Sequence, residues 1–113
     1  MKPICEIIVK KVMPLLRARV VYKLYNQYGR NQMKIAEKMG ISQSAVSRYI
    51  SGERGVCKEL LDKIPVIEEA ADKMAEMMVR GASEEEILEV VCETCEKIRS
   101  NPVFKKCLFE AKD

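Results

Sequence analysis

The chain has 113 residues, 48% of them hydrophobic and 33% charged, with five cysteines and no histidine. Its net charge of +3 is unevenly spread: residues 1–58 hold 12 Lys and Arg against 3 Asp and Glu, a net +9, whereas residues 59–113 hold 8 against 14, a net −6. These features argue against a membrane-spanning chain, which needs a long apolar run, and against an enzyme that uses a histidine base or a glycine-rich phosphate loop.

Two helices are predicted at the start of the chain, over residues 3–12 and from Leu15 to Tyr28. Apolar residues recur there every three or four positions, and Gly29 follows the second helix as a typical helix end. Pro14 lies between the two, where it favours either a helix start or a kink that joins both helices. The expected apolar positions of the second helix are Leu15, Leu16, Val20, Val21, Leu24, Tyr25 and Tyr28, and the expected polar positions are Arg17, Arg19 and Lys23.

Residues 32–51 predict two short helices around a tight turn. Gly40 stands where a left-handed residue ends the first helix, a conformation that only glycine adopts without penalty. Ser42 suits the N-cap of the second helix, over about 43–51, because its hydroxyl can accept a backbone N–H there. The apolar residues are Ile35, Ala36 and Met39 in the first helix and Val46, Tyr49 and Ile50 in the second, whose other side carries Gln43, Ser44, Ser47 and Arg48.

This stretch resembles the helix-turn-helix of phage-repressor (Cro-like) DNA-binding proteins, most closely from Ser42 to Gly52. The resemblance covers roughly the first 58 residues, and the whole chain also resembles small archaeal predicted transcriptional regulators, which carry a Cys-x-x-Cys near their end. The resemblance to the Cro-like helix-turn-helix implies that the helix over about 43–51 lies in the major groove of DNA. On this basis the base-facing residues would be Gln43, Ser44, Ser47 and Arg48, and the phosphate contacts would be Gln32, Lys34 and Arg54.

The polar side of the second helix leaves other interpretations open. A helical hairpin with a merely solvated face explains the apolar residues equally well, although Glu and Lys make a more usual helix surface than Gln, Ser and Arg. The latter can hydrogen-bond to base edges. The same helices would also suit a protein–protein interaction module without DNA readout, against which the basic first half argues, since basic residues suit phosphate contact. An enzyme ranks third, because only the cysteines offer any chemistry.

A domain boundary is predicted near Pro65. Residues 56–63 read as a short helix that closes the DNA-binding unit. We therefore expect a helix-turn-helix DNA-binding domain over residues 1–64 and a helical extension over residues 65–113, which serves dimerisation or regulation.

The extension is expected to hold three helices. A methionine-rich helix covers 66–79, a helix that starts with a capping box at Ser83 covers 83–100, and a last helix covers 102–111. No strand pattern is present, so the predicted fold class is all-α, with about seven helices. The expected apolar face of the second of these helices comprises Ile87, Leu88, Val91, Cys92, Cys95 and Ile98.

Cys92 and Cys95 have a spacing found in metal and redox sites, and they lie in a predicted helix, where residues three apart share a face. Without histidine a tetrahedral site needs four thiolates, so the further candidate ligands for zinc or an iron–sulfur cluster are Cys107, Cys57 and Cys5. A thiol–disulfide sensor is another interpretation. Cysteine is also a small, often buried residue, and we expect these cysteines to fill the core and hold no cofactor.

The leading hypothesis is a sequence-specific transcriptional regulator that binds double-stranded DNA as a homodimer. Proteins of this class use two copies to reach two half-sites, and the helices of 66–111 offer apolar faces for a subunit interface or for packing onto the DNA-binding unit. We expect a cytoplasmic protein without a membrane partner, because Glu6, Lys10 and Lys11 interrupt the first apolar stretch and make it unlike a signal peptide.

Overall fold

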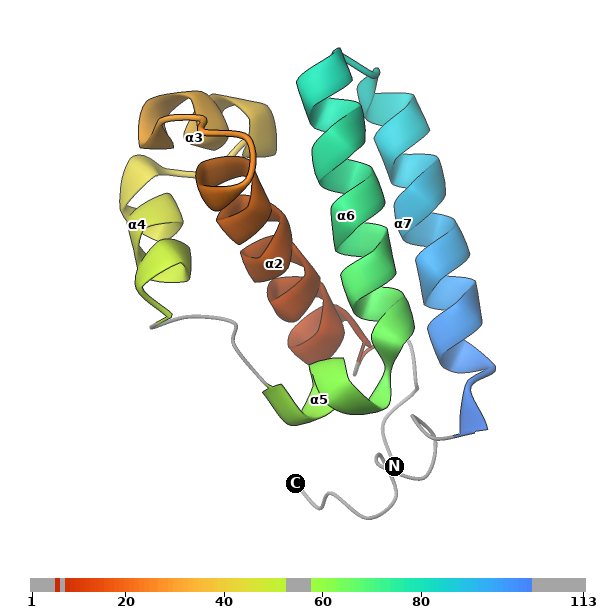
Figure 1. The fold of residues 1–113 in the computed structure, drawn as a ribbon. Helices are drawn as coiled ribbons and strands as arrows, with labels where there is room; N and C mark the ends of the chain where they lie inside the picture. The colour runs from red at the N-terminus through yellow and green to blue at the C-terminus, as the bar shows by residue number, and fades with distance from the viewer. Residues whose placement is uncertain (1–5, 7, 53–57, 103–113) are drawn as a thin grey trace.

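The computed structural model describes residue 6 and residues 8–52 and 58–102, and these residues form helices and short connections without any strand (Figure 1). The predicted all-α class is confirmed, and the number of helices is close to the one expected. A short π-helix, η1, precedes six α-helices over this part of the chain. Their bounds are Ile8–Val12 (η1), Met13–Asn26 (α2), Gln32–Met39 (α3), Gln43–Ser51 (α4), Lys58–Lys63 (α5), Pro65–Arg80 (α6) and Glu84–Arg99 (α7). No helix within the described ranges is long and apolar enough to cross a membrane.

The first two predicted helices are continuous over the described residues. Val12, which joins η1 to α2, has helical backbone angles of φ −83° and ψ −44°. Pro14 has no N–H to donate to the carbonyl one turn earlier, so the usual hydrogen bond between residues four apart is missing there. The π-helical turn of η1, whose hydrogen bonds join residues five apart, lies directly before this gap. The two helices thus meet without a break, with Pro14 in the first turn of α2 as expected at a helix start, while residues 1–5 and 7 lie outside the described part.

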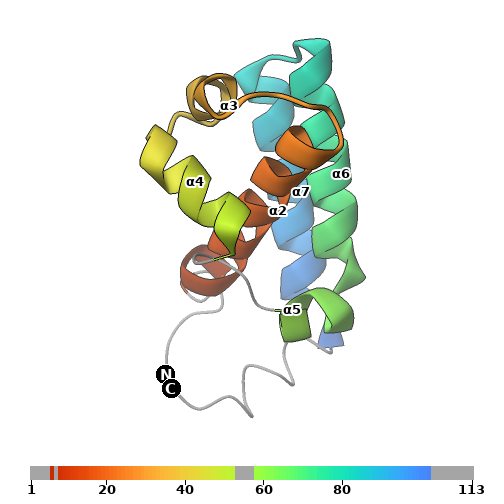
Figure 2. The same ribbon diagram turned by 60° about the vertical axis from the view of Figure 1, so that its left-hand side comes forward.

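α2 lies at the centre of the molecule (Figures 1 and 2). α3 and α4 pack on one side of it and α6 packs along the other, and α7 packs on the far side of α6 in Figure 1. Tyr25, expected on the apolar face of α2, is 40% exposed, whereas Lys23, expected on a polar face, is only 3% exposed. The reason is that α6, and not solvent, covers the side of α2 that carries Lys23.

α6 and α7 form a helical hairpin closed by a short turn. The predicted capping box at the start of α7 is confirmed: Ser83 Oγ accepts the backbone N–H of Glu86 at 3.2 Å, and the Glu86 carboxylate accepts the backbone N–H of Ser83 at 3.0 Å. That backbone hydrogen bond, together with the Ser83 hydroxyl, lowers the pKa of Glu86. The apolar residues predicted for α6 are buried, namely Ile67, Ala70, Ala71, Met74, Met77 and Met78.

The buried stripe of α7 is narrower than predicted and is rotated about the helix axis. Val90, Thr94 and Ile98 recur every four positions and are buried. Leu88 and Cys92, both expected on the apolar face, are exposed. In the described structure α7 packs mainly against α6, and one neighbouring helix covers only a narrow stripe. The half-buried residues of the predicted face are Ile87, Val91 and Cys95.

One hydrophobic core joins the described helices. It takes buried residues from η1, α2, α3, α4, α6 and α7, so residues on both sides of the predicted boundary at Pro65 contribute to it. Ile64, directly before Pro65, and Ile67, two residues after it, are fully buried. The helix predicted over 102–111 lies beyond the described residues from position 103 onward.

Candidate nucleic-acid interface

Local hydrogen bonds fix the ends of α3 and α4. Asn31 Oδ1 accepts the backbone N–H of Lys34 at 2.9 Å, and Ser42 Oγ accepts that of Ala45 at 3.1 Å, so each helix has a side-chain N-cap. Gly40 follows α3 with a left-handed φ of 66°. The predicted serine cap and glycine turn are therefore confirmed.

A small group of apolar side chains lies between this helix pair and α2. Ile35 of α3 and Val46 of α4 are fully buried, and Tyr49 is 5% exposed. Ala36 is half-buried and packs against the same cluster, as a small residue does where two helices approach closely. Figure 2 shows α4 crossing in front of α2, and the two helices pack against each other. The apolar side of α4 is thus fixed to the rest of the protein.

The opposite side of α4 faces solvent. Gln43 and Ser44 stand in its first turn, Ser47 and Arg48 about one turn later, and all four are exposed. Within the described residues the Arg48 side chain makes no ion pair, so its guanidinium remains available to a ligand. Amide, hydroxyl and guanidinium groups on one exposed face can donate or accept hydrogen bonds at the edges of base pairs.

Two of the three expected phosphate contacts lie in the first turn of α3. Gln32 is the first residue of that helix and is half-buried, and Lys34 is exposed. The partial positive charge at a helix N-terminus favours an anion at this place. Arg54, the third, lies outside the described residues.

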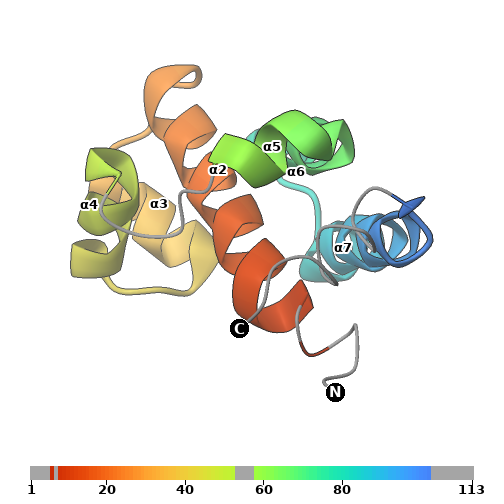
Figure 3. The same cartoon turned by 90° about the horizontal axis from the view of Figure 1, so that it is seen from below.

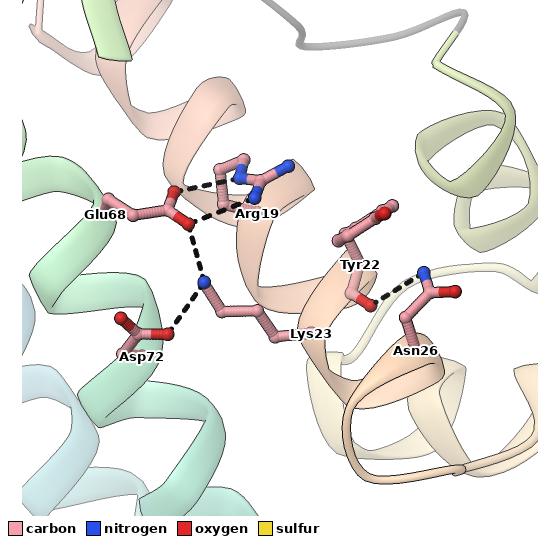
Figure 4. A network of polar contacts seen from close by, with 6 residues as sticks. All are labelled: Arg19, Tyr22, Lys23, Asn26, Glu68 and Asp72. Carbon is pink, nitrogen blue, oxygen red and sulfur yellow. Dashed lines mark hydrogen bonds and ion pairs between the residues drawn. The ribbon is translucent and has the colours of Figure 1, made fainter. Parts of the chain in front are cut away.

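An ion-pair network that sequence reasoning missed joins α2 to α6 (Figure 4). The Arg19 guanidinium donates to both Glu68 carboxylate oxygens, at 2.9 Å from Nε and 3.0 Å from Nη2. Lys23 Nζ lies 2.6 Å from Glu68 Oε2 and 2.7 Å from Asp72 Oδ1. Arg19 also stacks on an exposed aromatic side chain, with its guanidinium carbon 4.8 Å from the centre of the Tyr22 ring. Two positive charges of the basic half are therefore neutralised on the side of α2 that faces α6.

The network shifts the proton affinities of its members. The hydrogen bond from Arg19 lowers the pKa of Glu68 to about 2, with Lys23 adding to the effect. Burial pulls the pKa of Lys23 down, but hydrogen bonds to Asp72 and Glu68 outweigh it and leave that pKa raised. Arg19, Lys23 and Glu68 are thus all charged at neutral pH, and the carboxylates compensate the buried charge of Lys23. The sequence feature that could have indicated this network is the spacing of Glu68 and Asp72, which are four residues apart and therefore lie on one face of α6.

A second polar contact ties the helix-turn-helix to α6. Lys38 Nζ, near the end of α3, donates to the Met78 carbonyl oxygen at 3.1 Å. Met78 belongs to the last turn of α6, where carbonyl groups lack partners within the helix, and its carbonyl oxygen also accepts the backbone N–H of Gly81 at 3.2 Å. A basic side chain is favourable there. Lys38 therefore stabilises a helix end in addition to adding positive charge near α3.

The two described cysteines lie in different surroundings. Cys92 is exposed and Cys95 is half-buried, although both belong to α7. No group of three or more Cys, Asp or Glu residues in the described part of the chain is arranged to hold a metal ion. The other candidate ligands, Cys5, Cys57 and Cys107, lie outside the described residues.

These features together define a capped helix pair that presents one exposed polar helix face. Residues 21–65 match the family model described as Helix-turn-helix, a segment that extends from α2 to the start of α6. The match supports a DNA-binding helix-turn-helix family, which is a family of regulators and not of enzymes. No curated protein and no solved structure gives a significant match to the chain.

Proposed function

We propose that the protein is a sequence-specific DNA-binding transcriptional regulator of the Cro-like kind, which acts in the cytoplasm as a homodimer. The observation that carries this proposal is the exposed polar face of α4, formed by Gln43, Ser44, Ser47 and Arg48 on a helix whose other face is buried. An α-helix fits the major groove of B-DNA, where each base pair presents its own pattern of donors and acceptors. The family match over residues 21–65 supports the same conclusion.

The base-facing residues have distinct roles in this proposal. Gln43 and Ser44 lie at the N-terminal end of α4, which enters the groove first in helix-turn-helix proteins. A glutamine amide pairs well with adenine, and a serine hydroxyl can donate to or accept from several bases. Arg48, one turn further along, can donate two hydrogen bonds to guanine. Ser47 lies beside it on the same exposed side.

The phosphate-binding residues position α4 without reading sequence. Gln32 and Lys34 at the start of α3, together with Arg54 after α4, would contact the DNA backbone on either side of the groove. Neutralising phosphates releases condensed counterions, so binding should weaken steeply with salt. Arg19 and Lys23 take no part, because both are paired with carboxylates on α6.

The decisive experiment is selection of duplexes from a random pool by the purified full-length protein. We expect enrichment of an approximate palindrome, because a symmetric dimer reads two related half-sites. Recovery of duplexes that share no sequence, with affinity that depends on salt alone, would reduce the proposal to non-specific DNA binding. No binding at low salt would favour the alternative, a helical interaction module without DNA readout.

A further inference from the structure

The face of α7 that is turned away from α6 carries a shallow open groove. The described residues that line it are Glu85, Leu88, Glu89, Cys92, Glu93 and Glu96 of α7. These residues span about three helical turns, or roughly 16 Å along the axis. The groove is therefore an elongated surface of the length that a short helical segment can cover.

Leu88 is the apolar centre of this groove. Its side chain is 58% exposed, although it lies on a helix whose neighbouring Val90 is buried against α6. Cys92 follows one turn later on the same exposed side. An exposed leucine in a hollow is the kind of position that a partner's apolar side chain covers.

Four carboxylates surround this apolar centre. Within the described residues Glu85, Glu89 and Glu93 make no ion pair, whereas the α6 carboxylates Glu68 and Asp72 are both paired with bases of α2. Among the described residues the lining contains no basic side chain. The groove is thus acidic around an apolar strip, and its chemical complement is a strip of apolar residues flanked by Lys or Arg.

The groove lies far from the helix that faces DNA. Seen from below, α4 and α7 stand at opposite ends of the molecule, with α2 and α6 between them (Figure 3). Figure 1 shows the same order from α4 through α2 and α6 to α7. A ligand on α7 would therefore leave α4 accessible.

We propose that this groove on α7 is a docking surface for a basic amphipathic helix of another protein. Recognition of an amphipathic helix uses apolar anchors three or four positions apart, and Leu88 and Cys92 offer contacts at that spacing. Lysine and arginine side chains of the partner would pair with Glu85, Glu89 and Glu93. A second copy that presented the same groove is a poor occupant, because the two grooves would oppose like charges. The proposal does not depend on DNA binding and can be tested without DNA.

The test uses the full-length protein and a fluorescent probe peptide of about 18 residues, with leucines along one helical face and lysines and arginines on both flanks. Fluorescence anisotropy should show saturable binding that weakens with salt. Two altered peptides serve as controls: one replaces the basic residues with glutamate and the other replaces the leucines with serine. Neither should bind measurably at the concentrations that saturate the first peptide.

Three protein variants locate the binding surface. Leu88→Ser and Glu89→Lys should each weaken binding of the probe by about tenfold or more, because one removes the apolar anchor and the other reverses a charge. Glu69→Lys makes the same charge change at an exposed position of α6 outside the groove and should leave binding unchanged. Circular dichroism should show the same melting temperature for all three, since each side chain is exposed.

Each other result would overturn the proposal. Equal binding of the serine-substituted peptide would mean general charge attraction. A shift of Leu88→Ser from dimer to monomer in sedimentation would mean that a second copy covers the groove. Binding that strengthens about tenfold when Lys105→Glu and Lys106→Glu are combined would mean that the chain's own C-terminal residues compete for it. Saturable binding at equal affinity in all three variants would place the peptide elsewhere on the protein.

Discussion

At the residue scale, substitutions can distinguish the exposed side chains of α4, which would read bases, from the side chains that would hold phosphates. Gln43→Ala or Arg48→Ala should cost about 1–3 kcal/mol of binding free energy on the selected duplex and relax preference at particular base pairs. Both side chains are exposed, so neither change should lower the melting temperature. Equilibrium binding to the selected duplex and to its single-base variants measures the effect.

Lys34→Ala is the matched control for these variants. It removes a positive charge at the start of α3 and should weaken binding to every duplex alike, with the salt dependence reduced by about one phosphate contact. If Gln43→Ala and Arg48→Ala leave both affinity and base preference intact while Lys34→Ala weakens binding, α4 does not read the sequence.

The ionisation of Glu68 should make the free energy of unfolding depend on pH. Its folded-state pKa of about 2 lies below the ordinary 4.5, so the ionised carboxylate stabilises the fold above pH 4.5, and this contribution is lost as the pH falls from 4.5 toward 2. Glu68→Gln should lower the free energy of unfolding at pH 7 by about 1–2 kcal/mol, a figure reduced for solvent screening because the side chain is 36% exposed. Urea unfolding at a series of pH values measures both curves.

The two curves should converge in acid, because protonation removes from the natural protein what the substitution has already removed. Glu69→Gln provides the control, since Glu69 is an exposed neighbour on α6 and should follow the natural curve at every pH. Parallel curves for Glu68→Gln and the natural protein would show that the network does not control acid stability.

At the scale of single elements, the turn between α3 and α4 depends on backbone conformation. Gly40 has a φ of 66°, and a Cβ added there would meet no atom within 4 Å. Gly40→Ala should therefore cost only the backbone penalty of the left-handed region, about 1–2 kcal/mol. Gly40→Asn should cost less, because asparagine tolerates that region better than alanine. Thermal or urea unfolding of the two variants gives the comparison, and equal stabilities would contradict this account.

The elements that sequence predicted well are those fixed by near neighbours. Ser42 and Ser83 cap their helices through atoms three residues away, and Gly40 meets a requirement of its own backbone. Burial of Lys23 and exposure of Leu88 depend instead on which helix covers which face. Lys23 is covered by α6, whose Glu68 lies 45 residues further along the chain, so the periodicity within α2 could not reveal the burial of Lys23.

The candidate site was predictable to a similar extent. The exposed face of α4 follows from helical spacing alone, since Val46 and Tyr49 occupy the buried side. The roles of its residues came from the resemblance and remain predictions. The neutralisation of Arg19 and Lys23 was not predictable from net charge, because a count of basic residues does not say which of them are paired.

At the scale of the whole molecule, we expect a homodimer built mainly by residues 66–111, with DNA half-site centres about one helical turn, or roughly 34 Å, apart. Analytical ultracentrifugation of the full chain should show a dimer at micromolar concentration, and moving the half-sites apart by half a turn should weaken binding. A monomer at high concentration that binds single half-sites tightly would contradict the expectation.

The cysteines give a second prediction for the whole chain. We expect anaerobically purified protein to contain no stoichiometric zinc or iron, and the double variant Cys92→Ser, Cys95→Ser to melt only slightly below the natural protein, because Cys95 packs against the core. Metal analysis with a melting curve tests both statements. Near-stoichiometric metal that is lost in the variant, with a lower melting temperature, would instead establish a thiolate site, because metal-binding energy is folding energy.

The position of α2 between the helix-turn-helix and α6 has a consequence for the order of protein synthesis. While the ribosome is still making the chain, the Lys23 ammonium lacks Glu68 and Asp72, its two carboxylate partners from α6. The apolar residues of α2 that α6 later covers are in water at the same stage. A nascent chain that ends before α6 therefore contains α3 and α4 of the DNA-binding motif, but α2, on which they pack, is not yet covered by α6 on its other side. The ability to bind DNA should arise late in translation, once much of the acidic half of the chain has emerged.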